Sequence, residues 1–299
     1  MKIAYLDDKF VPLDRAKVSI LDRGFLYGDG VFETMRSYRG TVFRLEEHVG
    51  RLSRALKIIH IDLKLRFSKI EKIIYNLLDR NKLSACDCGG KDAYIKIITT
   101  RGRSSGLLAP PGRTRATFVV YALRYDPPPK RVYEEGIKTV ISKEGTNERS
   151  VIAGYKTLNY LHNILCRYEA VKKGFEDAVL INTKGFVSEA SSSNIFVVKR
   201  KELFTPCLKS GCLAGITRNE VTRIAKRILK YKTKESYVKI SDLYNADEVF
   251  ITNSLAEIMP VVKIDNRAIG SGRPGPVTKE VIALYKDSVE EYLKKQTIL

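Results

Sequence analysis

The chain has 299 residues, of which 44% are hydrophobic and 29% charged, a composition typical of a globular protein rather than a disordered one. No apolar run approaches the roughly 20 residues that cross a bilayer, and the amino end lacks the apolar core of a signal peptide, so we expect a cytoplasmic protein without a membrane span. The net charge of +19 admits a basic nucleic-acid-binding protein as a minor alternative, but Lys and Arg are spread along the chain and no recognisable nucleic-acid module is present.

The first part of the chain predicts a small sheet with two helices. Apolar residues recur at helical spacing from Leu45 to Ile59, with acidic Glu46 and Glu47 in the first turn, where the helix dipole favours them. A second amphipathic helix is expected over 68–81. The predicted strands are 2–6, 31–38, 41–44, 93–100 and 116–123.

A proline-rich segment, Asp126-Pro127-Pro128-Pro129-Lys130, separates two parts of the chain. Three consecutive prolines stiffen the backbone and cannot continue the hydrogen bonding of a neighbouring element. We therefore expect a small N-terminal α/β domain over 1–125, a linker over 126–132 and a larger C-terminal domain over 133–299.

The second part of the chain mixes strands and helices without strict alternation. A strand is expected over 137–142, a helix over 158–173, two strands across 177–199 joined around 182–185, and a helix over 217–229. Because runs of strands are interrupted irregularly by helices, an α+β fold is favoured over a doubly wound sheet.

The five cysteines predict neither a disulfide framework nor a metal site. Their number is odd in a long chain, so reduced thiols are expected. A zinc site built from Cys86, Cys88, Cys207 and Cys212 is a minor alternative, since the spacings do not match known zinc motifs and the chain has only three histidines. We expect no metal.

Lys156 is a candidate nucleophile. It lies among small and apolar residues between a predicted loop and a predicted helix, where partial desolvation favours the neutral, reactive form of an amine. Such an amine can form a Schiff base with an aldehyde. Taken alone, a lysine is also compatible with a solvated surface position.

Glu189 and the segment Gly215-Ile216-Thr217-Arg218 supply two further polar groups. Glu189 precedes a run of small polar residues that leaves room for a planar ring, and its carboxylate could pair with a pyridinium nitrogen. The glycine-containing segment leads into an amphipathic helix, whose first amides can bind a phosphate. Ser254 and Arg51 are further candidates for phosphate contacts. An exposed glutamate and a simple helix entry are the alternatives for these two features.

The order and spacing of these residues resemble a known family. From Leu21 to Lys279 the chain resembles the class IV, or fold type IV, pyridoxal phosphate enzymes, which include branched-chain aminotransferases, D-amino acid aminotransferases and aminodeoxychorismate lyases. The resemblance rests on the segments 27–33, 47–52, 156–161, 188–189, 193–196, 215–218 and 256–258.

This resemblance implies a cofactor, pyridoxal 5'-phosphate, and a role for each matching residue. Lys156 would be the Schiff-base lysine and proton shuttle, Glu189 the partner of the pyridine nitrogen, and Tyr160 a donor to the phenolic oxygen. The implied phosphate contacts are Arg51, Ile216, Thr217 and Ser254. The implied substrate contacts are Tyr27, Lys96, Ser254 and Leu255.

The resemblance also implies an architecture and a reaction. Its members have a small N-terminal α/β domain and a larger C-terminal pseudo-barrel domain, and a loop of a second subunit completes the site, so at least a homodimer is expected. The favoured reaction is a ping-pong transamination between a branched-chain or other apolar L-amino acid and 2-oxoglutarate. A D-amino acid aminotransferase or an aminodeoxychorismate lyase on the same fold is the alternative.

Two positions bear on the choice within the family. The D-amino acid enzymes use an Arg-x-His carboxylate trap, and the corresponding loop here, Thr100 to Leu107, has no histidine. Many branched-chain enzymes have an arginine where this chain has Lys96. A lysine can pair with a carboxylate only as a point charge, without the bidentate geometry of arginine.

Overall fold

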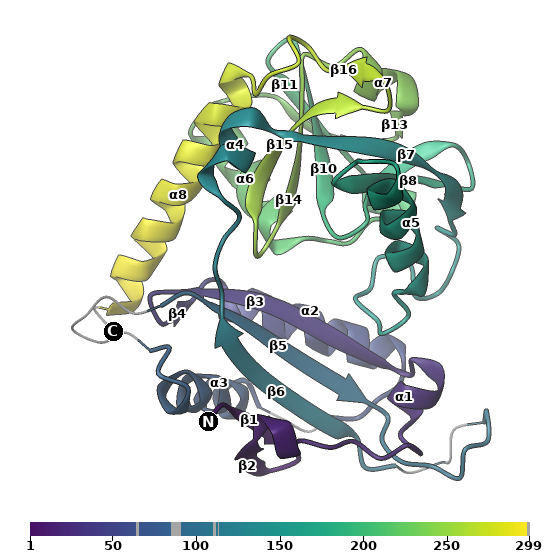
Figure 1. Ribbon diagram of the computed structural model, residues 1–299, viewed down its shortest axis with the longest axis vertical. Helices are drawn as coiled ribbons and strands as arrows, with labels where there is room; N and C mark the ends of the chain where they lie inside the picture. The colour runs from purple at the N-terminus through teal and green to yellow at the C-terminus, as the bar shows by residue number, and fades with distance from the viewer. Residues whose placement is uncertain (64–65, 85–90, 110–111, 113, 298–299) are drawn as a thin grey trace. The chain divides into compact units, whose positions relative to one another are not determined.

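The computed structural model describes residues 1–63, 66–84, 91–109, 112 and 114–297, and Cys86 and Cys88 of the alternative zinc site lie outside them. The chain divides into two compact units (Figure 1). Unit 1 contains Met1–Asp126, the short segment Tyr155–Asn159 and the chain from Tyr292 onward. Unit 2 contains Pro127–Gly154 and Tyr160–Glu291. The chain therefore returns to unit 1 twice, for five residues around Lys156 and at its C-terminal helix.

Unit 1 is built on a six-stranded antiparallel sheet with the strand order β2-β1-β6-β5-β3-β4. Its strands are β1 (Ile3–Leu6), β2 (Lys9–Pro12), β3 (Gly30–Tyr38), β4 (Thr41–Val42), β5 (Ala93–Thr100) and β6 (Thr117–Arg124). Two short helical segments, η1 (Leu13–Arg15) and α1 (Arg23–Tyr27), connect β2 to β3. The predicted strand over 41–44 is wrong at its end, because Arg44 adopts a left-handed backbone with φ of 56° and no longer pairs.

Two amphipathic helices pack on this sheet, as the apolar spacing predicts. Helix α2 (Leu45–Ile58) buries Val49 and Leu52, and helix α3 (Phe67–Arg80) buries Ile74 and Leu77 in the same apolar cluster. Each fully buried side chain of this size contributes about 1.5–3 kcal/mol through the hydrophobic effect. The cluster therefore fixes the sheet from which the site residues of unit 1 project.

Unit 2 is built on a ten-stranded sheet that curves into a nearly closed barrel (Figure 1). Most neighbours are antiparallel, whereas β7 pairs in parallel with β8 and β15, and β11 pairs in parallel with β12. Its strands are β7 (Ile137–Thr146), β8 (Asp177–Asn182), β9 (Phe186–Ala190), β10 (Asn194–Lys199), β11 (Glu202–Pro206), β12 (Thr233–Ser236), β13 (Val238–Lys239), β14 (Glu248–Asn253), β15 (Glu257–Ile264) and β16 (Arg267–Ala268).

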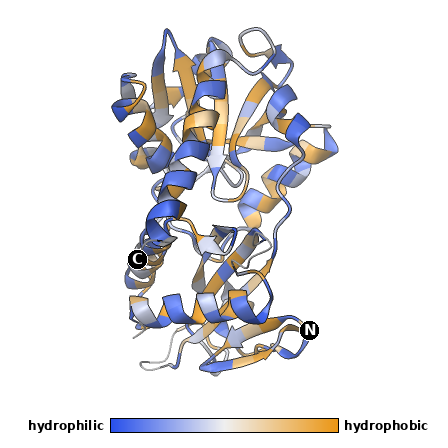
Figure 2. Ribbon diagram, turned by 90° about the vertical axis from the view of Figure 1, so that its left-hand side faces the viewer, coloured by the Kyte–Doolittle hydropathy of each residue, from blue (hydrophilic) through white to orange (hydrophobic). Residues whose placement is uncertain are grey.

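Helices flank this sheet. They are α4 (Lys130–Glu135), α5 (Leu161–Lys172), η2 (Leu208–Ser210), α6 (Ile216–Arg227), α7 (Ile240–Tyr244) and α8 (Pro276–Thr297). In α8, apolar residues four apart form the buried face, whereas the face toward the viewer in Figure 2 is mostly hydrophilic. These buried positions are Val277, Val281, Tyr285, Val289 and Leu293. None of the helices described has the length and apolar character required to cross a membrane.

Mixed, mostly antiparallel sheets with irregularly placed helices confirm the predicted α+β class. Two details of the prediction are wrong. The region 177–199 forms three strands rather than two, because residues 191–193 make a second turn that the local sequence of small polar residues does not separate from a strand. Helix α5 begins at Leu161 rather than Leu158, since the preceding residues pair with β3.

Candidate active site

Lys156 is positioned by backbone pairing with the start of β3. Thr157 forms a bridge with Val31, and the Phe32 amide donates to the Lys156 carbonyl at 2.9 Å. A side chain on Gly30 would lie 2.8 Å from Leu158, so only glycine lets the two segments approach this closely. The half-buried Lys156 ammonium lies 4.4 Å from the centre of the Phe32 ring. Its backbone is thus held on both sides of the amine-bearing residue.

A second amine, that of Lys96, faces the same ring. Lys96 projects from β5, where it pairs with Thr34 of β3, and its nitrogen lies 4.5 Å from the centre of the Phe32 ring. Burial, and then the positive charge of Lys156, lowers the pKa of Lys96 below its usual range. The structure therefore brings together Lys96 and Lys156, which are 60 residues apart in the sequence.

Tyr27 lies at the end of α1, and its hydroxyl donates to the Gly106 carbonyl. The Arg23 guanidinium lies over its ring, 5.1 Å from the centre, and also binds the carbonyls of Leu107 and Leu108 at 2.7 and 2.8 Å. Arg23 therefore ties α1 to the loop after β5. Tyr27 is 39% exposed, so its ring remains accessible.

Arg51 belongs to a buried charged cluster with Glu33 and His48. The Arg51 guanidinium donates to both Glu33 carboxylate oxygens, at 2.7 and 2.8 Å, and the ring Nδ1 of His48 lies 2.9 Å from the same carboxylate. All three side chains are at least nine-tenths buried. The bidentate pairing fixes the plane of the guanidinium, and its predicted phosphate contact stays a prediction.

The protonation states within this cluster follow from its contacts. Burial would raise the pKa of Glu33, but the positive charge and hydrogen bonds of Arg51, with the His48 contact, bring it to about 2. Burial lowers the pKa of His48, and its contact with Glu33 only partly offsets this effect. Neutral His48 can donate its Nδ1 proton to ionised Glu33.

Glu189 lies on β9 and is held by groups from two neighbouring segments. Its Oε2 atom accepts from the Leu213 amide at 3.0 Å and from the Asn194 side-chain amide at 3.3 Å. Burial, and then the negative charge of Glu189, raises the pKa of the Cys212 thiol to about 12. The carboxylate therefore lies beside the loop that leads into α6.

The N-terminus of α6 follows this loop directly. Gly215 is its N-cap and no side chain caps the helix, so the amides of Ile216 and Thr217 have no acceptor within the helix. A side chain on Gly215 would lie 1.9 Å from Oδ1 of Asn194, so this position requires glycine. Ile216 and Thr217 are buried in the first turn, at the end where the helix dipole attracts anions.

Ser254 and Leu255 lie in the turn between β14 and β15, which Asn253 organises. The Asn253 side-chain oxygen accepts from the amides of Leu255 and Ala256, at 2.9 and 2.7 Å. Its side-chain nitrogen donates to the Ser193 hydroxyl at 2.9 Å. The Leu255 amide thus already donates to Asn253, and a substrate carboxylate would have to share or displace that contact.

Within unit 2, the structure brings Glu189, the start of α6 and this turn together around Asn194. The backbone of Asn194 pairs with Thr252 of β14, and its side chain contacts Glu189 and Leu213. Tyr160, the N-cap residue of α5, is half-buried in this unit. Within unit 1 the structure brings together Lys96 and Lys156, whereas Tyr27 and Arg51 lie in separate contact networks.

Sequence reasoning gave no role to several polar residues of these networks. They are Glu33, His48, Asn194, Leu213 and Asn253. Glu33 and Asn194 lie in segments that carry the family resemblance, but nothing local in the sequence states which residue their side chains contact. The one signal for Asn194 is the neighbouring glycine requirement, which becomes visible only when Gly215 is placed against it.

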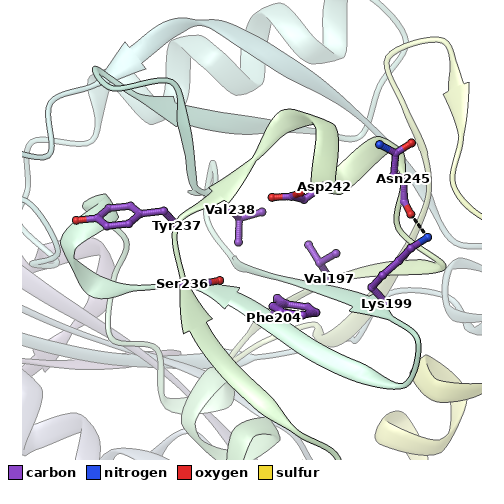
Figure 3. Close-up of a pocket in the computed structure, with 8 residues that line it drawn as sticks. All are labelled: Val197, Lys199, Phe204, Ser236, Tyr237, Val238, Asp242 and Asn245. Carbon is purple, nitrogen blue, oxygen red and sulfur yellow. Dashed lines mark hydrogen bonds between the residues drawn. The ribbon is translucent and has the colours of Figure 1, made fainter.

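A separate cavity of about 340 Å³ lies in unit 2 (Figure 3). Val197, Phe204 and Val238 face it, and Tyr237 points away. Its polar rim is engaged internally, because the Lys199 ammonium binds the Asn245 carbonyl and Asp247. None of the predicted site residues lines this cavity, so it is not part of the candidate site.

Comparison with known proteins agrees with this arrangement. The model of the family Amino-transferase class IV matches residues 30–264. The chain belongs to the class IV aminotransferases. It is 38% identical over 288 residues to a Methanocaldococcus jannaschii protein whose provisional name is branched-chain-amino-acid aminotransferase, with 96% of each chain covered. It is 32% identical to the D-alanine aminotransferase of Bacillus licheniformis, with 97% of each chain covered.

A solved class IV structure shares the fold of this aminotransferase. It is a branched-chain amino acid aminotransferase with pyridoxamine 5'-phosphate, from a source abbreviated T.th., with a TM-score of 0.89 and 30% sequence identity, and the match covers 96% of this chain and 94% of that one. Another structure of that enzyme is complexed with N-(5'-phosphopyridoxyl)-L-glutamate, with a TM-score of 0.87, 31% identity and the same coverage. The predicted fold type is thereby confirmed.

Proposed function

We propose that this class IV aminotransferase uses pyridoxal 5'-phosphate to move an amino group between a branched-chain or other apolar L-amino acid and 2-oxoglutarate. One observation carries the proposal. A carboxylate, Glu189, and an uncapped helix N-terminus at Gly215 lie in contact with the two ends of one short loop. A pyridinium nitrogen and a phosphate are the complementary groups at opposite ends of this cofactor.

The residues present fit such a cofactor in charge and in hydrogen bonding. Ionised Glu189 would hold the ring nitrogen protonated, and the amides of Ile216 and Thr217 would bind the phosphate. The hydroxyl of Thr252, two residues before Ser254, is buried and has no hydrogen-bond partner among the residues described. A buried polar atom of this kind is satisfied when a ligand brings a partner.

The chemistry divides between cofactor and protein. When bound, pyridoxal phosphate withdraws electrons from the α-carbon of the substrate. Lys156 holds the cofactor covalently in the resting enzyme and, once released, carries the α-proton from one carbon to another as a general base and acid. Tyr160, four residues further along the chain, would donate to the phenolic oxygen.

Lys96 supports an acidic second substrate. It is half-buried, and its ammonium faces the same aromatic ring as Lys156. A cation there can pair with the distal carboxylate of 2-oxoglutarate, and the glutamate moiety in the related phosphopyridoxyl-L-glutamate complex is consistent with such a substrate. Tyr27 and Leu255 would contribute to the site of the α-carboxylate.

The relatives leave two substrate classes in contention. Both a provisional branched-chain enzyme and a D-alanine aminotransferase match nearly the whole chain. The loop from Thr100 to Leu107 lacks the Arg-x-His pair of the D-specific enzymes, which favours L-amino acids. Aminodeoxychorismate lyase activity is a further alternative on the same fold.

A homodimer is part of this proposal, and helix α5 supports it. Five large apolar side chains on α5 are between 51% and 66% exposed, although the opposite face of the helix is already buried in unit 2. They recur at helical spacing as Leu161, Ile164, Leu165, Tyr168 and Val171. A soluble helix that is apolar on both faces is normally buried on both, and a second copy of the chain would cover this one.

The half-reactions of the loaded enzyme test the substrate assignment. We expect L-leucine to convert the bound cofactor to its amino form, and 2-oxoglutarate to restore it with release of L-glutamate. D-Alanine should act at least about tenfold more slowly, since its side chain and carboxylate exchange positions in the site. A response to D-alanine alone would transfer the assignment to the D-specific group, and formation of 4-aminobenzoate from aminodeoxychorismate would transfer it to the lyases.

A further inference from the structure

Asn194 is in contact with both halves of the proposed cofactor site of unit 2. Its side-chain nitrogen donates to Glu189 Oε2 at 3.3 Å and to the Leu213 carbonyl at 2.8 Å. Its side-chain oxygen packs against Gly215, the N-cap residue of α6. One carboxamide therefore contacts the carboxylate, the loop and the helix start.

Leu213 closes a small ring of hydrogen bonds with these groups. Its amide donates to the same Glu189 oxygen, at 3.0 Å, while its carbonyl accepts from Asn194. A shift of the loop would therefore alter both donors to Glu189 together. Asn194 is 5% exposed, so water cannot readily replace a lost hydrogen bond there.

We propose that Asn194 is a positioning residue that couples the Glu189 carboxylate to the phosphate-binding start of α6. The proposal rests on the proposed function, because it takes Glu189 and α6 as the two ends of the cofactor site. Asn194 does not touch the reacting atoms. It acts through Glu189, whose carboxylate it orients, and through Leu213 and Gly215, whose backbone it fixes.

The chemistry of the carboxamide explains why an asparagine fits this position. A donor must face Glu189 and the Leu213 carbonyl, both of which are acceptors. An aspartate of the same shape would present an acceptor instead and would repel Glu189. An alanine would leave both acceptors without this donor.

Three variants test the coupling by equilibrium binding of pyridoxal 5'-phosphate to the cofactor-free full-length protein. Hydrogen bonds to charged groups are worth about 1.5–3 kcal/mol, so Asn194→Ala and Asn194→Asp should each raise the Kd about tenfold to hundredfold. The absorbance band of the bound cofactor should also shift, because the ring nitrogen is less firmly protonated. Asn182→Ala is the matched control, since Asn182 is 3% exposed and makes three hydrogen bonds away from Glu189 and α6.

A second measurement separates positioning from a general effect on folding. If Asn194 acts through Glu189, the Asn194→Asp change made in a Glu189→Gln background should cost less binding than the same change in the parent protein. The thermal midpoint of each variant shows whether the fold persists. Asn194→Asp retains the size of the side chain and therefore guards against a variant that fails to fold.

The outcomes distinguish the two proposals. Unchanged Kd and spectrum in both Asn194 variants, an equal loss in Asn182→Ala, or additive effects with Glu189→Gln would overturn the role of Asn194 and leave the proposed function intact. Failure of the parent protein to bind pyridoxal phosphate would instead overturn the proposed function, and this inference with it.

Discussion

At the scale of single residues, the charged cluster of unit 1 shows how a buried cation is held in one orientation. Arg51 is fixed by both oxygens of Glu33, and His48 supports the same carboxylate. A buried ion pair is weak evidence for stability, but removal of one partner leaves the other charge buried and unpaired. The cluster therefore makes Arg51 depend on Glu33 for its burial.

The cluster predicts an acid-sensitive fold. The folded-state pKa of Glu33, about 2, lies below its ordinary value, so the pair stabilises the fold at neutral pH, and this contribution is lost as the pH falls toward 2. The depressed pKa of His48 acts in the same direction, since unfolded chains take up a proton there first. Together with the shift of Glu33, which corresponds to on the order of 3 kcal/mol, this gives stability that falls with acidification.

Glu33→Gln should remove the carboxyl part of this dependence and destabilise the protein at pH 7 by about 3–5 kcal/mol, because Arg51 stays buried without a counter-charge. Urea unfolding between pH 7 and pH 3 measures both effects. Asp8→Asn is the matched control, since Asp8 pairs with Lys69 at an exposed position and should change little. Equal stability of Glu33→Gln and the parent at pH 7 would show that the cluster does not hold Arg51 as described.

Residue identities were predictable where the sequence itself carries the signal. Lys156, Glu189 and the glycine before α6 were selected from residue type, local composition and order along the chain. Their supporting contacts were not, because Asn194 reaches Glu189 and Leu213 through turns whose geometry the local sequence does not state. The nearness of Lys96 and Lys156 likewise depends on strand pairing between distant segments.

At the scale of secondary-structure elements, α5 is the helix whose surface is least accounted for within one chain. Its inner face buries Cys166 and Ala170, while the outer stripe of five apolar side chains presents on the order of 500 Å². A standard interface buries about 800 Å² on each partner, so the stripe would supply much of one. In an antiparallel pair with its twofold axis at the level of residue 166, Leu161 would oppose Val171 and Ile164 would oppose Tyr168.

Leu165→Glu should therefore weaken dimerisation. A charge at the centre of the stripe enters the interface twice, once from each copy, and should raise the dimer Kd by about a hundredfold or more. Size-exclusion chromatography with light scattering measures the mass over a concentration series. Lys172→Glu, an exposed change on the same helix, is the control and should leave the mass unchanged. A monomeric parent protein, or a dimer in Leu165→Glu, would argue against this surface.

Elements with a clear period were predicted almost to their ends. Helices α2 and α3 follow their apolar spacing, and β5 covers the predicted residues 93–100. The errors arise where tertiary contacts override local preference. Lys156 to Leu158 extends along β3 instead of starting α5, and Ser191 to Ser193 turns between β9 and β10 because the barrel needs a further antiparallel strand there.

At the scale of the whole molecule, the chain order itself serves the site. The amine-bearing segment leaves unit 2 at Gly154, pairs with the sheet of unit 1 and returns at Tyr160. A net charge of +19 adds a long-range field that attracts anions, and both pyridoxal phosphate and 2-oxoglutarate are anions. Such steering speeds association and weakens as salt is added.

The assignment of Lys156 as the residue that holds the cofactor is the central claim of this account. The most direct test is to load the protein with pyridoxal 5'-phosphate, trap the covalent bond by borohydride reduction and locate the modified residue by peptide mass spectrometry. We predict modification of Lys156 and not of neighbouring Lys96, and loss of both the visible band and transamination in Lys156→Ala. Modification of a different lysine, or full activity of Lys156→Ala, would contradict the account.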